Sequence, residues 1–309
     1  MAPKVSAEDA RSLLVERGHD VAELIPVTGG LWSATYAFTE AGRDYIVRFH
    51  ERRDDLEKDR FAMRWGSPRL RVPQIVDIAD TPLGPYGISV RARGSPIDDL
   101  DADGMRAVLP ALFATLDAIR EASTSGTTGY GLWHGDGNAP TPTWRANLVN
   151  EDAIARSRAT LVGSPVGTAA FDAGVERMRG LVDSCPETRY VVHNDLLYRN
   201  VLHGPDGIVM LDWGASIYGD FLYDMALLTI WWPYYASRWR GIDIRAEIER
   251  HYAEIGLQIP HFAERLRCYE LDIATSHIAF QGSYGMWDTA AWTAKRTADL
   301  AKRDLGGSD

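Results

Sequence analysis

Hydrophobic and polar residues alternate through the first ninety-odd positions in a pattern that predicts a small, mostly antiparallel sheet. The stretch LIPVTGGLWSATYAFTEAGRDYIVRFH predicts a strand, a glycine turn, a strand, a turn at Ala41–Gly42 and a third strand. VPQIVDIAD and PYGISVRARG add two more strands. Two helices interrupt this pattern: an amphipathic one over residues 6–17, with Ser6 as N-cap, and DDLEKDRFAMRWG, which Gly66 ends.

After Gly94 the pattern becomes mainly helical. Helical spacing is found in MRAVLPALFATLDAIREA, FDAGVERMRGLVDSC, DMALLTIWW, RAEIERHYAEIG and most of residues 261–303. Short strands are expected in NVLHG and GIVMLDW, and residues 123–145, rich in Gly, Thr and Pro, read as a long loop of unassigned role. The pattern therefore predicts an α+β fold of two lobes, a sheet lobe over 1–93 and a larger helical lobe over 94–309.

Composition narrows the class of protein. The 309 residues are 45% hydrophobic and 25% charged, as in soluble globular proteins, and the net charge of −10 argues against nucleic acid as a partner. Cys185 and Cys268 have no metal-binding spacing and read as reduced thiols of a cytoplasmic protein. The N-terminus does not resemble a signal peptide, and the longest apolar run contains a proline and is too short to span a bilayer.

Two polar stretches are candidates for catalysis. HNDLLYRN places His193, Asp195 and Asn200 on one compact loop, which could orient a hydroxyl substrate and offer an oxygen to magnesium, or could be an ordinary polar turn. GIVMLDWG delivers Asp212 at the end of an apolar strand. Asp212 alone would read as a turn cap, but beside the first stretch it predicts that Asn200 and Asp212 share a magnesium ion bridging the phosphates of ATP.

Two further stretches could hold the nucleotide phosphates. In TGGLWSATY, Gly29 and Gly30 let backbone N–H groups approach an anion, with Ser33 as a further donor, although a glycine pair is also common in hairpins. In YIVRFH, Arg48 could grip phosphates as a planar fork with Asp59 fixing its rotamer, or could be an exposed strand arginine. In GDFLYDMALL, a carboxylate at the start of an apolar helix predicts a capping or loop-tethering role for Asp224.

These stretches, in this order, resemble the aminoglycoside phosphotransferase family within the protein-kinase-like fold. The family patterns H-G-D-x4-N, I-D-W and G-D-P-x-x-D-L-A appear here as HNDLLYRN, LDWG and GDFLYDMA. The resemblance extends over nearly the whole chain. Within the family the chain is most similar to the hygromycin B phosphotransferases, through stretches such as KDRFAMR, SCPETRYVVHNDLLYRNVL and WWPYY.

The resemblance implies a role for each matching residue. Asp195 would be the catalytic base or hydroxyl-orienting acid, with His193 bracing its loop, while Asn200 and Asp212 would hold Mg²⁺. The nucleotide, ATP with GTP as an alternative, would meet Gly29 to Ser33 as the phosphate loop, Arg48 with its partner Asp59 at the phosphates, and the hinge Val90 to Ala92 at the adenine.

The sequence departs from the family pattern at four of these positions. Asn194 stands in place of the glycine of H-G-D, Phe221 in place of the proline of G-D-P, Arg48 in place of the usual lysine and Asp59 in place of glutamate. None of these changes removes the proposed base or a metal ligand. The Arg48 change leaves nucleotide affinity, and the choice between ATP and GTP, open.

The acceptor is expected between the catalytic loop and the C-terminal helices, where acids and aromatics gather. Carboxylates would bind protonated amines and aromatic faces would stack on sugar rings, so Asp288 and Trp287 are candidate contacts, although aromatics at helical spacing more often form core. We expect a monomeric or weakly dimeric kinase of a small cationic sugar, hygromycin B or a related aminocyclitol, that gives resistance. The alternatives are a metabolic or macrolide kinase of the same fold, and a nucleotide-binding protein without turnover.

Overall fold

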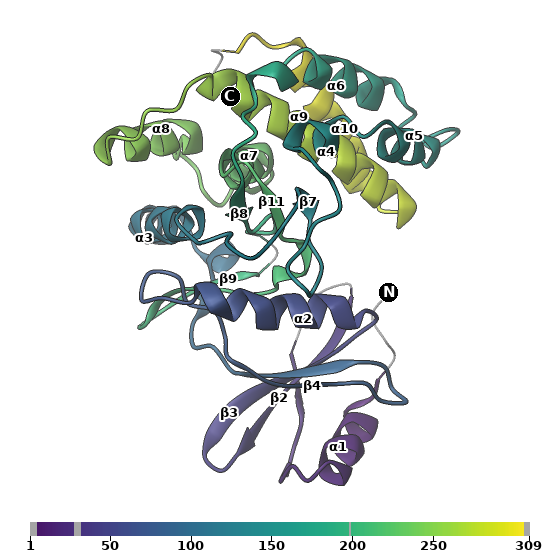
Figure 1. Cartoon of the computed structure of the whole chain (residues 1–309), viewed down its shortest axis with the longest axis vertical. Coiled ribbons are helices and arrows are strands. Elements are labelled where there is room, and N and C mark those ends of the chain that lie inside the picture. The colour runs from purple at the N-terminus through teal and green to yellow at the C-terminus, as the bar shows by residue number, and fades with distance from the viewer. Residues whose placement is uncertain (1–4, 28–31, 198, 306–309) are drawn as a thin grey trace.

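The computed structural model describes residues 5–27, 32–197 and 199–305, and Figure 1 shows a sheet at one end and a helical lobe at the other. Among the described residues the sheet is antiparallel, with strand order β1-β2-β3-β5-β4. Its strands are β1 (Ile25–Pro26), β2 (Ser33–Glu40), β3 (Arg43–His50), β4 (Ile75–Ala79) and β5 (Tyr86–Val90). The prediction of a small antiparallel-sheet lobe is confirmed.

Local sequence explains the hairpin and the first helix. Ala41 and Gly42 both have positive φ, at 49° and 76°, the conformation that a tight two-residue hairpin turn requires. Helix α1 (Ala7–Glu16) begins where the Ser6 side chain accepts a hydrogen bond from the Asp9 N–H, as predicted. Helix α2 (Arg53–Ala62) continues as the 3-10 turn η1 (Met63–Trp65) before Gly66.

The remaining chain forms the larger helical lobe. Its helices are α3 (Ala102–Arg120), α4 (Trp144–Leu148), α5 (Glu151–Ala159), α6 (Ala169–Arg179), α7 (Leu222–Trp231), α8 (Ile244–Glu254), α9 (Phe262–Ser283) and α10 (Trp287–Lys302). Short 3-10 turns are η2 (Ile97–Asp99), η3 (Val182–Ser184), η4 (Trp213–Ala215) and η5 (Trp232–Tyr235). In the described part of the chain, no helix has the length and apolarity needed to cross a membrane.

Two small sheets in this lobe carry the polar stretches. One has the order β10-β9-β6, formed by β6 (Ser95–Pro96), β9 (Val201–Gly204) and β10 (Gly207–Met210). The other has the order β7-β11-β8, formed by β7 (Gly131–Leu132), β8 (Tyr190–Val192) and β11 (Ile217–Gly219). Residues 123–145 are therefore not wholly irregular, since they contain β7 and the first two residues of α4.

Helix α2 belongs to the sheet lobe by sequence but packs on the core of the helical lobe. The sheet and α1 enclose a core of their own that includes Phe38, Val47 and Ile88. Ala62 and Trp65, at the end of α2 and in η1, are buried in the larger core of the helical lobe instead. Figure 1 shows α2 lying between the sheet and the helices. This position brings side chains of α2 to the loops that carry the candidate catalytic residues.

Candidate active site

His193 connects the loop after β8 with the segment before Asp212. Its side chain is fully buried, and Nε2 donates to the Leu211 carbonyl oxygen at 2.9 Å. Nδ1 is then the acceptor for the Asp195 N–H, at 3.3 Å. Burial lowers the pKa of His193 to about 4, so the imidazole is neutral and can donate through one ring nitrogen and accept through the other. The ring thereby fixes the backbone beside both candidate acids.

Asp224 at the start of α7 tethers the same loop. Its carboxylate accepts the N–H groups of His193 at 2.9 Å and Asn194 at 2.8 Å. Asn194 has φ of 62°, a left-handed conformation that glycine adopts most readily and asparagine next. The departure from H-G-D is thus compatible with the loop, and the Asn194 amide also donates to the Ala215 carbonyl at 2.9 Å. The predicted loop-tethering role of Asp224 agrees with these contacts.

Asp195 and Asn200 lie in direct contact, with the Asn200 Nδ2 donating to the Asp195 Oδ2 at 2.7 Å. The Leu211 N–H donates to the Asn200 carbonyl at 2.8 Å, which places the residue next to Asp212 beside the same loop. Burial, and then the negative charge of Asp212, raise the pKa of Asp195 to about 8. Asp195, Asn200 and Asp212 are therefore brought together as the sequence predicted.

Arg48 and Asp59 join the sheet lobe to this cluster. The Arg48 guanidinium contacts the Asp59 carboxylate and, through Nη1, the Asp212 Oδ2 at 3.1 Å. The other Asp59 oxygen accepts the Trp213 N–H at 2.8 Å. The Arg48 cation lowers the pKa of Asp212 against the opposing effect of burial. Arg48 is thus a half-buried arginine paired with two carboxylates, and the alternative of an exposed strand arginine is wrong.

Comparison with known proteins agrees with this geometry. Residues 23–265 match the family described as "APH: Phosphotransferase enzyme family". The chain belongs to that family. The phosphotransferase is 29% identical over 311 aligned residues to the "Hygromycin-B 4-O-kinase" of Escherichia coli, covering 98% of this chain and 88% of the relative.

Solved structures identify the fold. The phosphotransferase matches a crystal structure of aminoglycoside phosphotransferase APH(4)-Ia with TM-score 0.85 and 27% identity, covering 98% of this chain and 100% of that one. A thermostable mutant of the same enzyme, in ternary complex with AMP-PNP and hygromycin B, matches with TM-score 0.86 and 28% identity, covering 97% and 100%. The predicted protein-kinase-like fold is confirmed.

The structure describes only some of the residues that are predicted to contact the nucleotide. Gly29 and Gly30 lie outside the described residues, and Ser33, at the start of β2, hydrogen-bonds the Thr35 hydroxyl at 3.2 Å. In the hinge, the Val90 N–H donates to the Gln74 carbonyl at 2.9 Å, so this N–H already has a partner. Ala92 is partly buried just beyond β5. The roles of these residues stay predictions.

The predicted acceptor contacts lie at the start of α10. Asp288 is exposed, and Trp287 packs against α9, where a Cβ added at Gly282 would lie 3.3 Å from its ring. Their role also stays a prediction. Trp231, on α7, is buried in the core and stacks on the partly buried Trp292 at 5.3 Å between ring centroids.

The cluster fits a magnesium ion in its chemistry. The Asn200 amide and the Asp212 carboxylate supply the hard oxygen atoms that Mg²⁺ prefers, and the Asp212 side chain is 41% exposed, so a ligand can reach it. Within the described ranges, no group of three or more His, Cys, Asp or Glu side chains is arranged as a metal site. A carboxylate and an amide suffice for Mg²⁺ when phosphates and water complete its shell.

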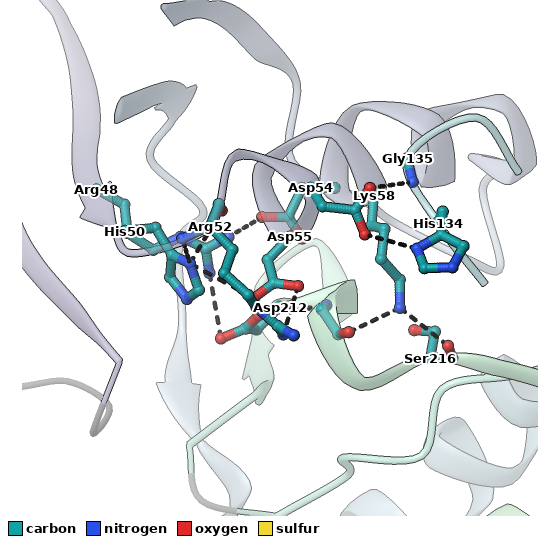
Figure 2. Close-up of polar contacts among 12 residues, drawn as sticks. Arg48, His50, Arg52, Asp54, Asp55, Lys58, His134, Gly135, Asp212 and Ser216 are labelled. Atoms are coloured by element: carbon teal, nitrogen blue, oxygen red, sulfur yellow. Dashed lines mark hydrogen bonds and ion pairs between the residues drawn. The ribbon is translucent and has the colours of Figure 1, made fainter. Parts of the chain in front are cut away.

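Sequence reasoning missed the polar side of α2, drawn in Figure 2. Lys58 is buried next to Asp59, and Asp55 is buried beside His50 at 3.4 Å. Positions 55, 58, 59 and 62 share one helix face by their spacing, and three of them are charged. Asp59, the predicted partner of Arg48, lies on this face. Other charged residues on the same face were therefore a signal that the face packs against polar groups.

Proposed function

We propose that this phosphotransferase moves the γ-phosphoryl group of ATP to a hydroxyl group of hygromycin B or a closely related aminocyclitol, and thereby gives resistance. The supporting observation is the convergence of Asp195, Asn200, Asp212 and the Arg48–Asp59 pair in a chain that resembles the hygromycin B kinase over nearly its whole length. The name of that relative makes the 4-hydroxyl the position we propose for transfer.

In this proposal Asp195 orients the acceptor hydroxyl and takes its proton. Burial raises the pKa of Asp195, so its carboxylate, once ionised, is a stronger base than an ordinary aspartate. The neutral His193 ring holds the Asp195 backbone in place, because the ring Nδ1 accepts a hydrogen bond from the Asp195 N–H. Arg48, aligned by Asp59, binds phosphate oxygens. Asn200 and Asp212 hold Mg²⁺, which when bound neutralises the charge on the phosphates.

The acceptor proposal rests on charge and on likeness. Hygromycin B appears with AMP-PNP in the complex of the solved relative, and the net charge of −10 of this chain favours a cationic sugar. We propose Asp288 and Trp287 as contacts of that sugar. If they are, Asp288→Asn raises the KM for the antibiotic and leaves the KM for ATP unchanged.

The test is phosphate transfer by the purified chain with ATP and Mg²⁺, using a panel of hygromycin B, other aminoglycosides, a macrolide and GTP as an alternative donor. We expect transfer to hygromycin B, and we expect Asp195→Asn to lower kcat by about 10²–10⁴-fold. Growth of a susceptible bacterium expressing each form gives a second reading. A macrolide or a cellular alcohol as the only acceptor, or an Asp195→Asn variant with full activity, would refute the proposal.

A further inference from the structure

Lys58 is a buried cation at the contact between α2 and the turn that follows Asp212. Its side chain is 1% exposed. Nζ donates to the Gly214 carbonyl at 2.7 Å and to the Ser216 carbonyl at 3.0 Å. Figure 2 shows the Lys58 side chain reaching from α2 to this turn. In that view Asp55 lies between Lys58 and Arg48. The ammonium thus holds two carbonyls from a segment more than 150 positions away in sequence.

The loop 123–145, whose role the sequence left unassigned, covers the remaining side of Lys58. The fully buried Trp133 ring lies under Nζ at 4.5 Å from its centroid, within cation–π range. The loop is docked on α2, because the Asp54 carboxylate accepts the Gly135 N–H at 2.7 Å. At Gly137 the fit allows no side chain, since a Cβ would lie 2.2 Å from the Phe61 ring.

Burying this lysine is costly for stability. Desolvation lowers the pKa of Lys58 to about 8, against the attraction of nearby acids such as Asp55. Its hydrogen-bond partners at the turn are two carbonyls, so the ammonium offsets part of its desolvation by satisfying backbone groups of that turn. A buried ammonium whose hydrogen bonds all go to one turn points to a task in holding that turn.

Lys58 and Asp59 together bind both the N–H and the carbonyl groups of one short turn, residues 213–216. Asp59 accepts the Trp213 N–H at 2.8 Å, while Lys58 donates to carbonyls one and three residues further on. The turn begins at Asp212, which has φ of 55°, a strained conformation for a residue other than glycine. Adjacent side chains of opposite charge thus hold the backbone that sets the direction of the Asp212 carboxylate.

We propose that Lys58 is a positioning residue: with Asp59, it fixes the turn after Asp212 so that the Asp212 carboxylate is oriented for the magnesium ion of Mg·nucleotide. The loop 123–145 supports Lys58 in this role, because it places Trp133 against the ammonium and packs on α2. This inference rests on the proposed function, in which Asp212 is a magnesium ligand. It assigns a role to a lysine that does not itself touch metal or nucleotide.

The test is nucleotide binding, measured by calorimetry on the full chain with ADP in the presence and absence of Mg²⁺. We expect Lys58→Met to leave ADP affinity without Mg²⁺ unchanged and to reduce the gain in affinity on adding Mg²⁺ by about tenfold, the lower end of losses seen when support of a metal ligand is removed. Arg60→Met is the matched control: it removes an exposed cation, paired with Glu57 at 3.1 Å, from the same helix, and should keep the full gain.

Each outcome decides between the alternatives. A Lys58→Met protein with the full Mg²⁺-dependent gain overturns the inference, as does an equal loss of affinity with and without Mg²⁺, which would indicate general damage to the fold. If Lys58→Met does not fold, Lys58→Gln, which keeps one donor group, is measured with the same criteria. If wild type shows no gain, or Asp212→Asn keeps it, the proposed magnesium role fails instead, independently of Lys58.

Discussion

Asp224→Asn should separate the placement of the catalytic loop from the stability of the fold. Asp224 is 3% exposed and accepts two N–H groups of the loop, from His193 at 2.9 Å and Asn194 at 2.8 Å. Asparagine has nearly the same shape but only one acceptor oxygen. Its amide NH₂ must therefore face one of the two N–H groups, and the loop loses one of its two anchors beside Asp195.

The effect on stability follows from two opposing contributions. Burial raises the pKa of Asp224 from 3.8 to about 6, so ionisation of this carboxyl costs the folded state about 3 kcal/mol at neutral pH. Removing the charge recovers that cost, whereas a buried N–H without an acceptor loses about 1–3 kcal/mol. The free energy of unfolding should therefore change little. The loop should still shift, and a misplacement of about 1 Å at a catalytic group costs about 10²-fold in rate.

The assay is kcat for antibiotic phosphorylation beside urea unfolding at pH 7. We expect Asp224→Asn to lower kcat about 10²-fold with nearly unchanged stability. The control is Leu109→Ala in the core of α3, 2% exposed, which should lose about 2–5 kcal/mol of stability and retain kcat. A variant that keeps wild-type kcat, or one that unfolds while retaining the activity of its folded fraction, would show that the tether serves stability and not the loop.

Three further outcomes are expected. Arg48→Lys should weaken nucleotide binding by about 10–100-fold in calorimetry, because an ammonium cannot contact two carboxylates and a phosphate at once as a planar guanidinium does. Each lost hydrogen bond to a charged group costs about 1.5–3 kcal/mol of binding free energy. Unchanged affinity would contradict this role. His277 is partly buried, desolvation lowers its pKa to about 4, and its Nδ1 accepts the Trp231 Nε1–H at 3.1 Å. The unfolded chain therefore binds the extra proton first, and His277 by itself should lower stability by about 1.4 kcal/mol per unit as pH drops from about 6.5 towards 4. His277→Gln should therefore show a slope shallower than wild type by that amount in urea unfolding, and an equal slope would sink the assignment. Arg265→Met should destabilise the fold by about 3–5 kcal/mol, because Asp220 would be left as a buried charge after losing hydrogen bonds of 2.8 and 2.9 Å; a melting temperature equal to wild type would contradict it.

The sequence alone was sufficient wherever the information is local. The hairpin turn at Ala41–Gly42, the Ser6 cap and the short spacing of His193, Asp195 and Asn200 each depend on neighbours within a few positions. Such spacings place residues on one turn or loop whatever surrounds them, so the two-lobed fold and the principal acids could be predicted. The contact between Arg48 and Asp59 was predicted as well, although its extension to Asp212 was not.

Only the tertiary structure decided how α2 meets the catalytic segments. Lys58 and Asp59 hold a turn more than 150 positions away, and Trp133 from a loop of unassigned role completes the contact. No periodicity indicates which carbonyls a buried lysine will meet. The pKa of Asp195 depends likewise on burial and on a charge brought near by folding. Desolvation and distance act through space, so they take their values only when the lobes have packed together.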